Sequence, residues 1–185
     1  MTNLEVGCLD GPAAIGLRTE IVTIYRSVFT PPPFNDSERE VGWFGEEFAD
    51  DVSRPEFRCI AAQVGGVLVG FAYGFRTFVA DPWNGWYEEV LRSVGPIASE
   101  RWIRGQFAVG WFAVRPDHQG RGIGACLHDT LIASVEETRW WLVTHDLDTP
   151  ARRLYQRRGW CELGRGPLGW GKTERVVLGL ERRSG

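Results

Sequence analysis

Residues 106–135 constrain the fold of this chain more than any other segment. They contain a strand-like run, a short spacer, and a glycine-rich stretch at the start of a helix. Gln106–Val114 is rich in aromatic and branched residues, which favour a strand. The spacer Arg115–Gln119 follows, and then three glycines at alternate positions, Gly120, Gly122 and Gly124. Apolar residues at helical spacing come next, namely Ile123, Leu127, Leu131 and Val135. The pattern predicts a strand, a glycine-rich loop and a helix.

Such a loop suits a phosphate group. The first N–H groups of a helix have no partner within the helix and carry partial positive charge, so they attract anions. Glycines leave the backbone open to close approach by a ligand. We therefore expect the loop to hold a phosphate or pyrophosphate, although a glycine turn that only packs a helix onto a sheet is an alternative.

Two nucleotide-binding motifs fit the loop poorly. The P-loop of nucleotide triphosphatases needs a lysine after its last glycine, and Ala125 follows Gly124 here. The dinucleotide fingerprint is matched literally by Gly120, Gly122 and Ala125, with Asp146 at a suitable distance for a ribose contact. In that fold, however, the strand runs almost directly into the first glycine, and too little chain follows here for a full doubly wound sheet.

The rest of the chain predicts a mixed α/β domain. Further strands are expected at 3–9, 57–64, 67–75, 140–144, 160–163 and 175–180, and Gly65-Gly66 indicates a hairpin between the second and third of these runs. Helices are expected with apolar stripes at 17–28 and 41–52, the latter starting with a capping box at Ser37, and at 150–158. Residues 77–105 are expected to form a long irregular segment. We predict one domain over residues 1–185.

Composition excludes several classes of protein. The 185 residues are 43% hydrophobic and 24% charged, as in a soluble globular domain, and no apolar run approaches the length of a membrane span. A formal net charge of −3 argues against a nucleic-acid or anionic-membrane partner. The N-terminus has no secretion signal, so a cytoplasmic protein is expected. The four scattered cysteines are expected to be small buried hydrophobes, and neither they nor the histidines have the spacing of a metal site.

The spacer distinguishes a third motif. Val114, four residues and then Gln119-x-x-Gly122-x-Gly124 resembles the acetyl-CoA pyrophosphate loop of the GNAT superfamily of N-acetyltransferases. A second stretch, from Asp148 through Tyr155 to Gly159-Trp160, resembles the family's N-x-x-A-x-x-[LF]-Y…G-[FW] segment. The order of the expected strands and helices is also similar to that of the family. Asp148 is a departure, because the family usually has an asparagine there.

The resemblance implies a fold, a cofactor and a reaction. The fold would be a mixed, mostly antiparallel twisted sheet with flanking helices, with strands splayed at the acetyl-CoA site. The activity would be transfer of an acetyl group from acetyl-CoA to a primary amine, with Tyr155 as the general acid that protonates the leaving thiolate. Tyr155 could instead belong to the packed face of a short helix. The implied acetyl-CoA-binding residues are Phe112, Ala113, Val114, Gln119, Gly120, Arg121, Gly122, Ile123, Gly124, Ala125, Asp148 and Ala151.

The general base is left open. Many members of the family carry a glutamate in the strand before the glycine loop, and Gln106–Val114 contains no carboxylate. The candidates elsewhere are Asp36, Glu88, Glu89, Glu100 and His145. A catalytically silent acyl-CoA-binding module is therefore the alternative to an enzyme.

The acceptor is expected to lie against three segments, Thr30–Asp36, 77–105 and Gly164–Lys172. Acidic residues in the second helix and in the 77–105 segment accompany aromatic ones: Glu38, Glu40, Glu46, Glu47, Asp50, Asp51, Asp81, Glu88 and Glu89, with Trp83, Trp86 and Tyr87. Carboxylates beside aromatic faces suit a small cationic amine, for example an aminoglycoside-like molecule, a polyamine or a metabolite. The alternative is a solvated acidic face with tryptophans in the core. A peptide amine is also open, and a homodimer is possible because dimers are common in the family.

Overall fold

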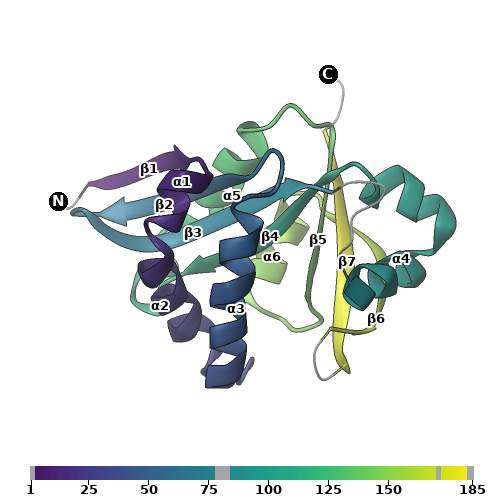
Figure 1. The fold of residues 1–185 in the computed structure, drawn as a ribbon, viewed down its shortest axis with the longest axis horizontal. Helices are drawn as coiled ribbons and strands as arrows, with labels where there is room; N and C mark the ends of the chain where they lie inside the picture. Colours follow the sequence, from purple (N-terminus) through teal and green to yellow (C-terminus); the bar gives the residue numbers. More distant parts are fainter. Residues whose placement is uncertain (1–2, 78–83, 170–171, 183–185) are drawn as a thin grey trace. The chain divides into compact units, whose positions relative to one another are not determined.

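The strands form one mixed sheet. The structure, a computed structural model, describes residues 3–77, 84–169 and 172–182 (Figure 1). Seven strands among these residues are ordered β1-β2-β3-β4-β5-β7-β6 in the sheet. Their bounds are β1 Leu4–Leu9, β2 Arg58–Val64, β3 Val67–Arg76, β4 Phe107–Val114, β5 Arg139–His145, β6 Cys161–Leu168 and β7 Thr173–Glu181. Pairs β1–β2, β2–β3, β5–β7 and β6–β7 are antiparallel, and β4–β5 is parallel. The predicted mixed, mostly antiparallel sheet is confirmed.

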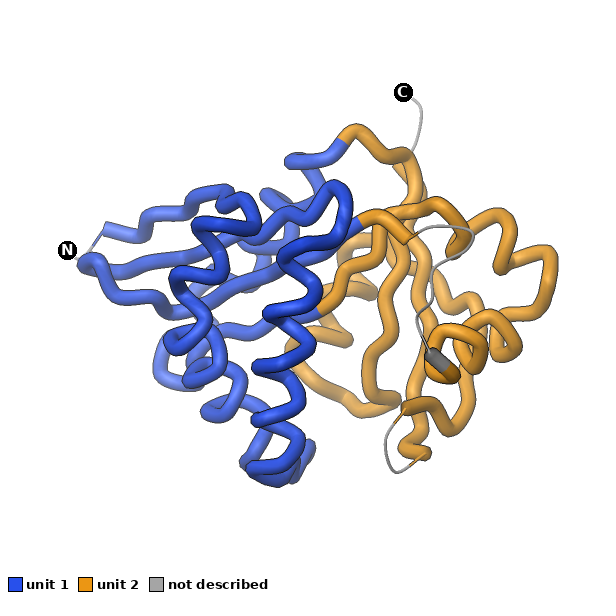
Figure 2. Tube along the Cα trace, viewed as in Figure 1, with its two compact units in different colours: residues 1–75, 111–135 blue, residues 76–110, 136–185 orange. Residues whose placement is uncertain are grey.

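Contacts along the backbone divide the chain into two compact units (Figure 2). Unit 1 consists of residues 1–75 and 111–135, and unit 2 of residues 76–110 and 136–185. The division falls within β4, so Trp111–Val114 belong to unit 1 and Phe107–Gly110 to unit 2. The single domain expected over the whole chain stays a prediction.

Unit 1 contains the helices α1 (Gly11–Ile15), α2 (Arg18–Phe29), α3 (Glu38–Asp51) and α5 (Ile123–Ala133). The predicted capping box at the start of α3 is confirmed. The backbone N–H of Ser37 donates to the Glu40 carboxylate at 2.6 Å, and the Ser37 hydroxyl accepts from the backbone N–H of Glu40 at 3.4 Å. These bonds satisfy donors that a helix start otherwise leaves unpaired, so the sequence fixes where α3 begins.

In unit 1, helices pack on both faces of β3. Successive side chains of a strand point to opposite faces, so neighbouring residues of β3 contact different helices. On one face Phe71 lies 6.1 Å from Phe44 of α3, measured between ring centroids, and Tyr73 lies 5.3 Å from Phe48. On the other face a Cβ on Gly70 would lie 3.0 Å from Cδ1 of Leu127 in α5. The helix that follows the glycine loop is therefore held directly against the sheet.

Unit 2 corrects the prediction for residues 77–105. Its helices are α4 (Asn84–Ala98) and α6 (Pro150–Arg157), and a π-helical turn, η1 (Ser99–Ile103), follows α4. The prediction of an irregular segment is therefore wrong over residues 84–103, which are most of its length. Tyr87, Val90 and Leu91 have the i, i+3, i+4 spacing of a buried helix face and are buried. Gly95, with φ 79°, and the following Pro96 interrupt the helical dihedrals, which obscures the pattern in the sequence. Asp81 and Trp83 lie outside the described residues.

Two further expectations fail. The segment Gly164–Lys172 is not simply a loop, since β6 continues through it to Leu168 and pairs with β7. The four cysteines are free thiols, but Cys8 and Cys161 are exposed and only Cys59 is fully buried. Cys8 lies in β1, which has β2 as its only neighbour in the sheet order, and Cys161 begins β6 at the other end of that order. Strands with a single neighbour are covered less than central ones.

Candidate active site

The glycine loop has the backbone expected of an anion cradle. Gly120 and Gly122 have φ values of 75° and 82°, in the left-handed region that favours glycine. A Cβ on either residue would meet no atom within 4 Å, so the space beside both glycines is open. Gly122 is the N-cap of α5, and no side chain caps the helix there. The amides at the start of α5 can therefore face a bound anion.

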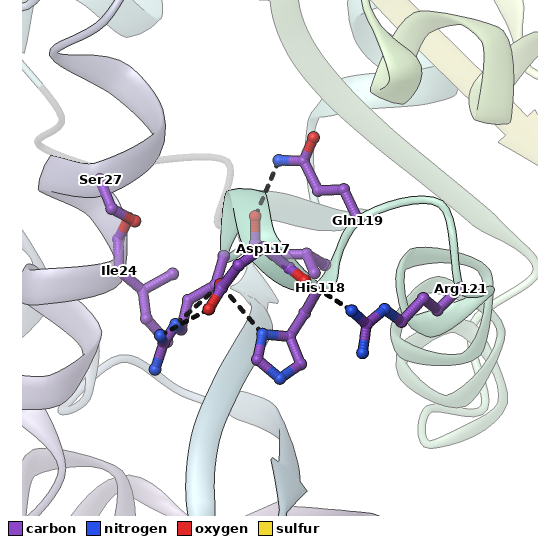
Figure 3. A network of polar contacts seen from close by, with 8 residues as sticks. Ile24, Ser27, Asp117, His118, Gln119 and Arg121 are labelled. Atoms are coloured by element: carbon purple, nitrogen blue, oxygen red, sulfur yellow. Dashed lines mark hydrogen bonds and ion pairs between the residues drawn. The ribbon is translucent and has the colours of Figure 1, made fainter.

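Side chains of the spacer hold this loop in shape (Figure 3). The Gln119 amide nitrogen donates to the carbonyl of Val114 at 2.9 Å and so links the start of the loop to the end of β4. Arg121 donates to the carbonyl of Asp117 at 3.0 Å. Hydrogen bonds from His118 and Arg115 to the Asp117 carboxylate lower its pKa to about 2. The spacer thus orients the loop before any ligand arrives.

The end of β4 packs against the start of α5. Ala113 and Val114 are buried, and Phe112 is half-buried. A Cβ on Gly124 would lie 3.2 Å from Cζ of Phe112, which explains why a glycine stands at this position. The structure therefore brings together the predicted residues of β4 and those of the loop, Gln119 to Ala125, within unit 1.

Unit 2 holds the other predicted residues. Thr149 caps α6, where its hydroxyl accepts from the backbone N–H of Arg152 at 3.2 Å, and Ala151 in the first turn is half-buried. The Asp148 carboxylate lies 2.6 Å from a guanidinium nitrogen of Arg153, and the Asp148 side chain is 82% exposed. The residue that departs from the family motif thus pairs with a cation of the helix that follows it.

Tyr155 lies on the buried side of α6. It is 6% exposed, and its ring centroid lies 5.6 Å from that of Trp160. Burial raises the pKa of the Tyr155 phenol above its ordinary value of 10.0. The hydroxyl therefore stays protonated at neutral pH, as a proton donor must.

The candidate bases differ in their surroundings. Glu89 accepts from the Lys172 ammonium and from the Gly169 backbone N–H, and these bonds lower its pKa. Glu100 pairs with Arg104 at 3.0 Å, whereas Glu88 is exposed.

The remaining two candidates are more enclosed. Burial, together with the charge of Arg175, lowers the pKa of His145 to about 4, so its imidazole is neutral at pH 7. Asp36 accepts a 2.5 Å hydrogen bond from the Tyr25 hydroxyl.

A hydrogen-bonded pair that the sequence pattern does not predict joins β4 to α3. The indole N–H of Trp111 donates to Oε2 of Glu47 in α3 at 2.8 Å. Glu47 had been counted only among the acidic residues of its helix. A usable signal was present, because Glu47 is three residues after the buried Phe44 and so borders the apolar stripe of α3.

The acidic helix is not uniformly solvated. Asp51 is 2% exposed, and its carboxylate accepts from Arg54 at 2.7 Å and from the Tyr73 hydroxyl at 3.0 Å. In unit 2, Tyr87 is buried, and the Trp86 ring stacks on Trp141 at 6.4 Å. Within the described residues, no group of three or more histidine, cysteine or acidic side chains could hold a metal ion. No helix among them is long and apolar enough to cross a membrane.

Solved structures of several acetyltransferases share the fold of this chain. The ribosomal-protein-S18-alanine N-acetyltransferase of Escherichia coli is 17% identical, with a TM-score of 0.63 over 99% of this chain and 97% of that chain. The PaiA N-acetyltransferase of Thermoplasma acidophilum, solved with coenzyme A, is 11% identical, with a TM-score of 0.62 over 97% and 99%. An aminoglycoside 6'-acetyltransferase type Ii is 20% identical, with a TM-score of 0.61 over 98% and 99%. A comparison with curated proteins finds no match.

The mostly antiparallel sheet also excludes the doubly wound dinucleotide fold, whose strands are mostly parallel. A family model described as the acetyltransferase (GNAT) family matches residues 19–160, which include the glycine loop, α6 and most of the sheet. The chain belongs to the GNAT family of acetyltransferases.

Proposed function

We propose that this protein is a cytoplasmic, acetyl-CoA-dependent N-acetyltransferase whose acceptor is a small cationic amine. The observation that carries the proposal is the loop before α5, where Gly120 and Gly122 have positive φ, open space beside them and no side-chain cap on the helix. Membership of the family supports the reaction type, and the coenzyme A complex of the Thermoplasma relative supports the cofactor.

The loop residues fit the pyrophosphate of acetyl-CoA. Backbone amides of Gln119 to Gly124 and of Ala125 would hold the phosphate oxygens, and Arg121 adds an exposed cation on the same loop. The backbone of Phe112–Val114 would hydrogen-bond to the pantetheine amides as an added strand would. When bound, acetyl-CoA supplies an acetyl thioester that a neutral amine can attack.

Tyr155 is the proposed general acid because of its place in the family motif. Burial raises the pKa of its phenol, which keeps the hydroxyl protonated at neutral pH but also makes it a weaker acid than an exposed tyrosine. Ala151 and Asp148 would lie along the pantetheine, but Asp148, paired with Arg153, offers only acceptor atoms there. His145, neutral at pH 7, could accept a proton but is a weak base.

The experiment that tests this function is an amine screen. The full chain is mixed with acetyl-CoA and a panel of aminoglycosides, polyamines, small amines and short peptides, and free thiol is followed over time. We expect amine-dependent thiol release with at least one cationic small amine. Release only with peptides would overturn the proposed acceptor but not the reaction.

A silent acyl-CoA-binding module is the second candidate, because no residue of β4 carries a carboxylate. Titration calorimetry with acetyl-CoA separates the two possibilities. Binding of acetyl-CoA without release of its thiol in the presence of any amine would favour the silent module. Absence of acetyl-CoA binding would contradict both.

A further inference from the structure

The strand and loop proposed to hold acetyl-CoA suggest where its acetyl group would lie, and this step rests on the proposed function. The pyrophosphate would sit at Gln119–Gly124, and the pantetheine would run back along Val114 to Phe112. A strand advances about 3.3 Å per residue, so the acyl end would reach the neighbourhood of Trp111. The side chains around Trp111 are therefore the ones that an attacking amine meets first within unit 1.

Trp111 is held by aromatic neighbours. The centroids of the Tyr25, Phe44 and Phe29 rings lie 5.0, 5.3 and 5.4 Å from that of Trp111, each at a steep angle to it. Trp43 lies 6.4 Å away on the same helix as Phe44. Because these rings come from two helices, α2 and α3, they fix the indole and with it the direction of its N–H.

The fixed indole orients a carboxylate. Its N–H donates to Oε2 of Glu47 at 2.8 Å, and the side chains of both residues are only half-buried. A second carboxylate, Asp36, accepts from the Tyr25 hydroxyl at 2.5 Å. Burial raises the pKa of Tyr25 most, and the Asp36 hydrogen bond and the negative charges of Asp36, Glu40 and Glu47 raise it further. Glu40 takes part in the capping box of α3.

Negative charge beside a half-buried aromatic ring favours a cation. We propose that Glu47, oriented by the N–H of Trp111, binds the ammonium group of the acceptor and makes the protein selective for cationic amines. Trp111 is the positioning residue, and its ring adds an aromatic face beside the carboxylate. A carboxylate on α3 would thereby supply a contact that β4, which has no acidic residue, does not offer.

The test measures amine binding without turnover. Phenethylamine and 1,4-diaminobutane are titrated by calorimetry into the full chain, with and without coenzyme A, and 2-phenylethanol and 1,4-butanediol serve as uncharged counterparts. We expect at least one amine to bind about tenfold or more tightly than its alcohol, as charge-assisted hydrogen bonds allow. Binding of neither amine, or equal binding of amine and alcohol, would overturn the inference.

Variants locate the effect. Glu47→Gln keeps an oxygen for the Trp111 N–H but removes the charge, and it should weaken amine binding about tenfold while leaving acetyl-CoA binding unchanged. Glu46→Gln is the matched control, since it removes an exposed charge from the neighbouring position of α3 and should change binding less than twofold. Trp111→Phe should reduce the preference for amine over alcohol. An unchanged preference in Glu47→Gln would overturn the role of Glu47, and an unchanged preference in Trp111→Phe would overturn that of Trp111.

The outcome also separates this inference from the proposed function. Amine binding that depends on Glu47, in a protein that does not bind acetyl-CoA, would retain the inference about Glu47 and overturn the proposed function. Amine-dependent release of thiol from acetyl-CoA, with the same KM for the amine in Glu47→Gln as in the native chain, would overturn the inference about Glu47 and retain the proposed function.

Discussion

The buried phenol of Tyr155 gives the proposed mechanism its most direct test. Replacing Tyr155 by phenylalanine removes the proposed proton donor and little volume. Because a thiol has a pKa of about 8.5, the thiolate can leave without full protonation, and we expect turnover to fall about tenfold rather than a thousandfold. The rate of thiol release, followed by stopped flow under conditions in which the chemical step limits it, measures this change in turnover. The affinity for acetyl-CoA and the thermal midpoint of unfolding are the controls. Unchanged turnover in the variant would contradict the catalytic role and assign Tyr155 to packing, as against Trp160.

The residues of the proposed site were predictable to different degrees. The glycine loop was recognisable because its chemistry is local: the positive φ of Gly120 and Gly122 and the Gln119 bond to Val114 all lie within nine residues of sequence, 114–122. The pairing of Glu47 could not be recognised in the sequence, because its partner Trp111 is 64 positions away and only packing brings the two together. Likewise, sequence cannot tell that Asp51 is buried while the adjacent Asp50 is exposed.

At the scale of elements, the packing of α4 against β6 offers a second prediction. A Cβ on Gly164 of β6 would lie 2.5 Å from the backbone oxygen of Ser93 in α4, and backbone cannot give way as a flexible side chain can. We expect Gly164→Ala to lower the free energy of unfolding by about 1–3 kcal/mol, the usual cost of overpacking. Urea denaturation followed by tryptophan fluorescence measures the change.

Gly7→Ala provides the control for that substitution. Gly7 also lies in a strand, β1, but a Cβ there would meet nothing within 4 Å. The same change should therefore leave stability within about 0.5 kcal/mol. Equal losses in the two variants would mean that loss of glycine itself, and not contact with α4, determines the cost.

Elements with a strong local signal were predictable, and those defined by packing were not. The capping box fixed the start of α3, and Gly65-Gly66 indicated the β2–β3 hairpin, whose register begins at the pair Val64–Val67. The helix α4 was missed because Gly95 and Pro96 interrupt its helical pattern. The extension of β6 to Leu168 was missed because residues such as Gly164, Gly166 and Pro167 have low strand propensity, and only pairing with β7 holds them in the sheet.

The whole molecule depends on pairings that no local pattern specifies. The order of the seven strands along the chain was predicted, but their order in the sheet was not: β7 lies beside β5, and β6 lies outside it. This exchange is set by the antiparallel pairing of β5 and β7, which runs from Arg139–Glu181 to His145–Arg175. Such long ladders form between residues far apart in sequence, so they follow from the tertiary structure as a whole.

Stability of the whole molecule should depend on pH through one buried carboxyl. Burial raises the pKa of Asp51 from 3.8 to about 6, and this effect outweighs the opposite influence of Arg54 and of the Tyr73 hydroxyl. Between those two values the folded chain holds a proton that the unfolded chain releases, so the free energy of unfolding falls as pH rises. The stabilising contribution is fully present below about pH 4 and is lost above about pH 6. The difference in pKa corresponds to at most about 3 kcal/mol.

Other carboxyls make the free energy of unfolding rise with pH, because hydrogen-bond partners lower the pKa of Asp117 and Glu181. The contribution of Asp51 must therefore be isolated by substitution. Urea unfolding is measured at several pH values from 4 to 7 for the native chain, Asp51→Asn and the control Asp50→Asn. The stability of the native chain relative to Asp51→Asn should decrease by up to about 3 kcal/mol over this range, whereas the exposed Asp50 should give a nearly constant difference. A relative stability that rises with pH would mean that the Arg54 ion pair, and not burial, controls the titration of Asp51, because a lowered pKa stabilises the fold at higher pH.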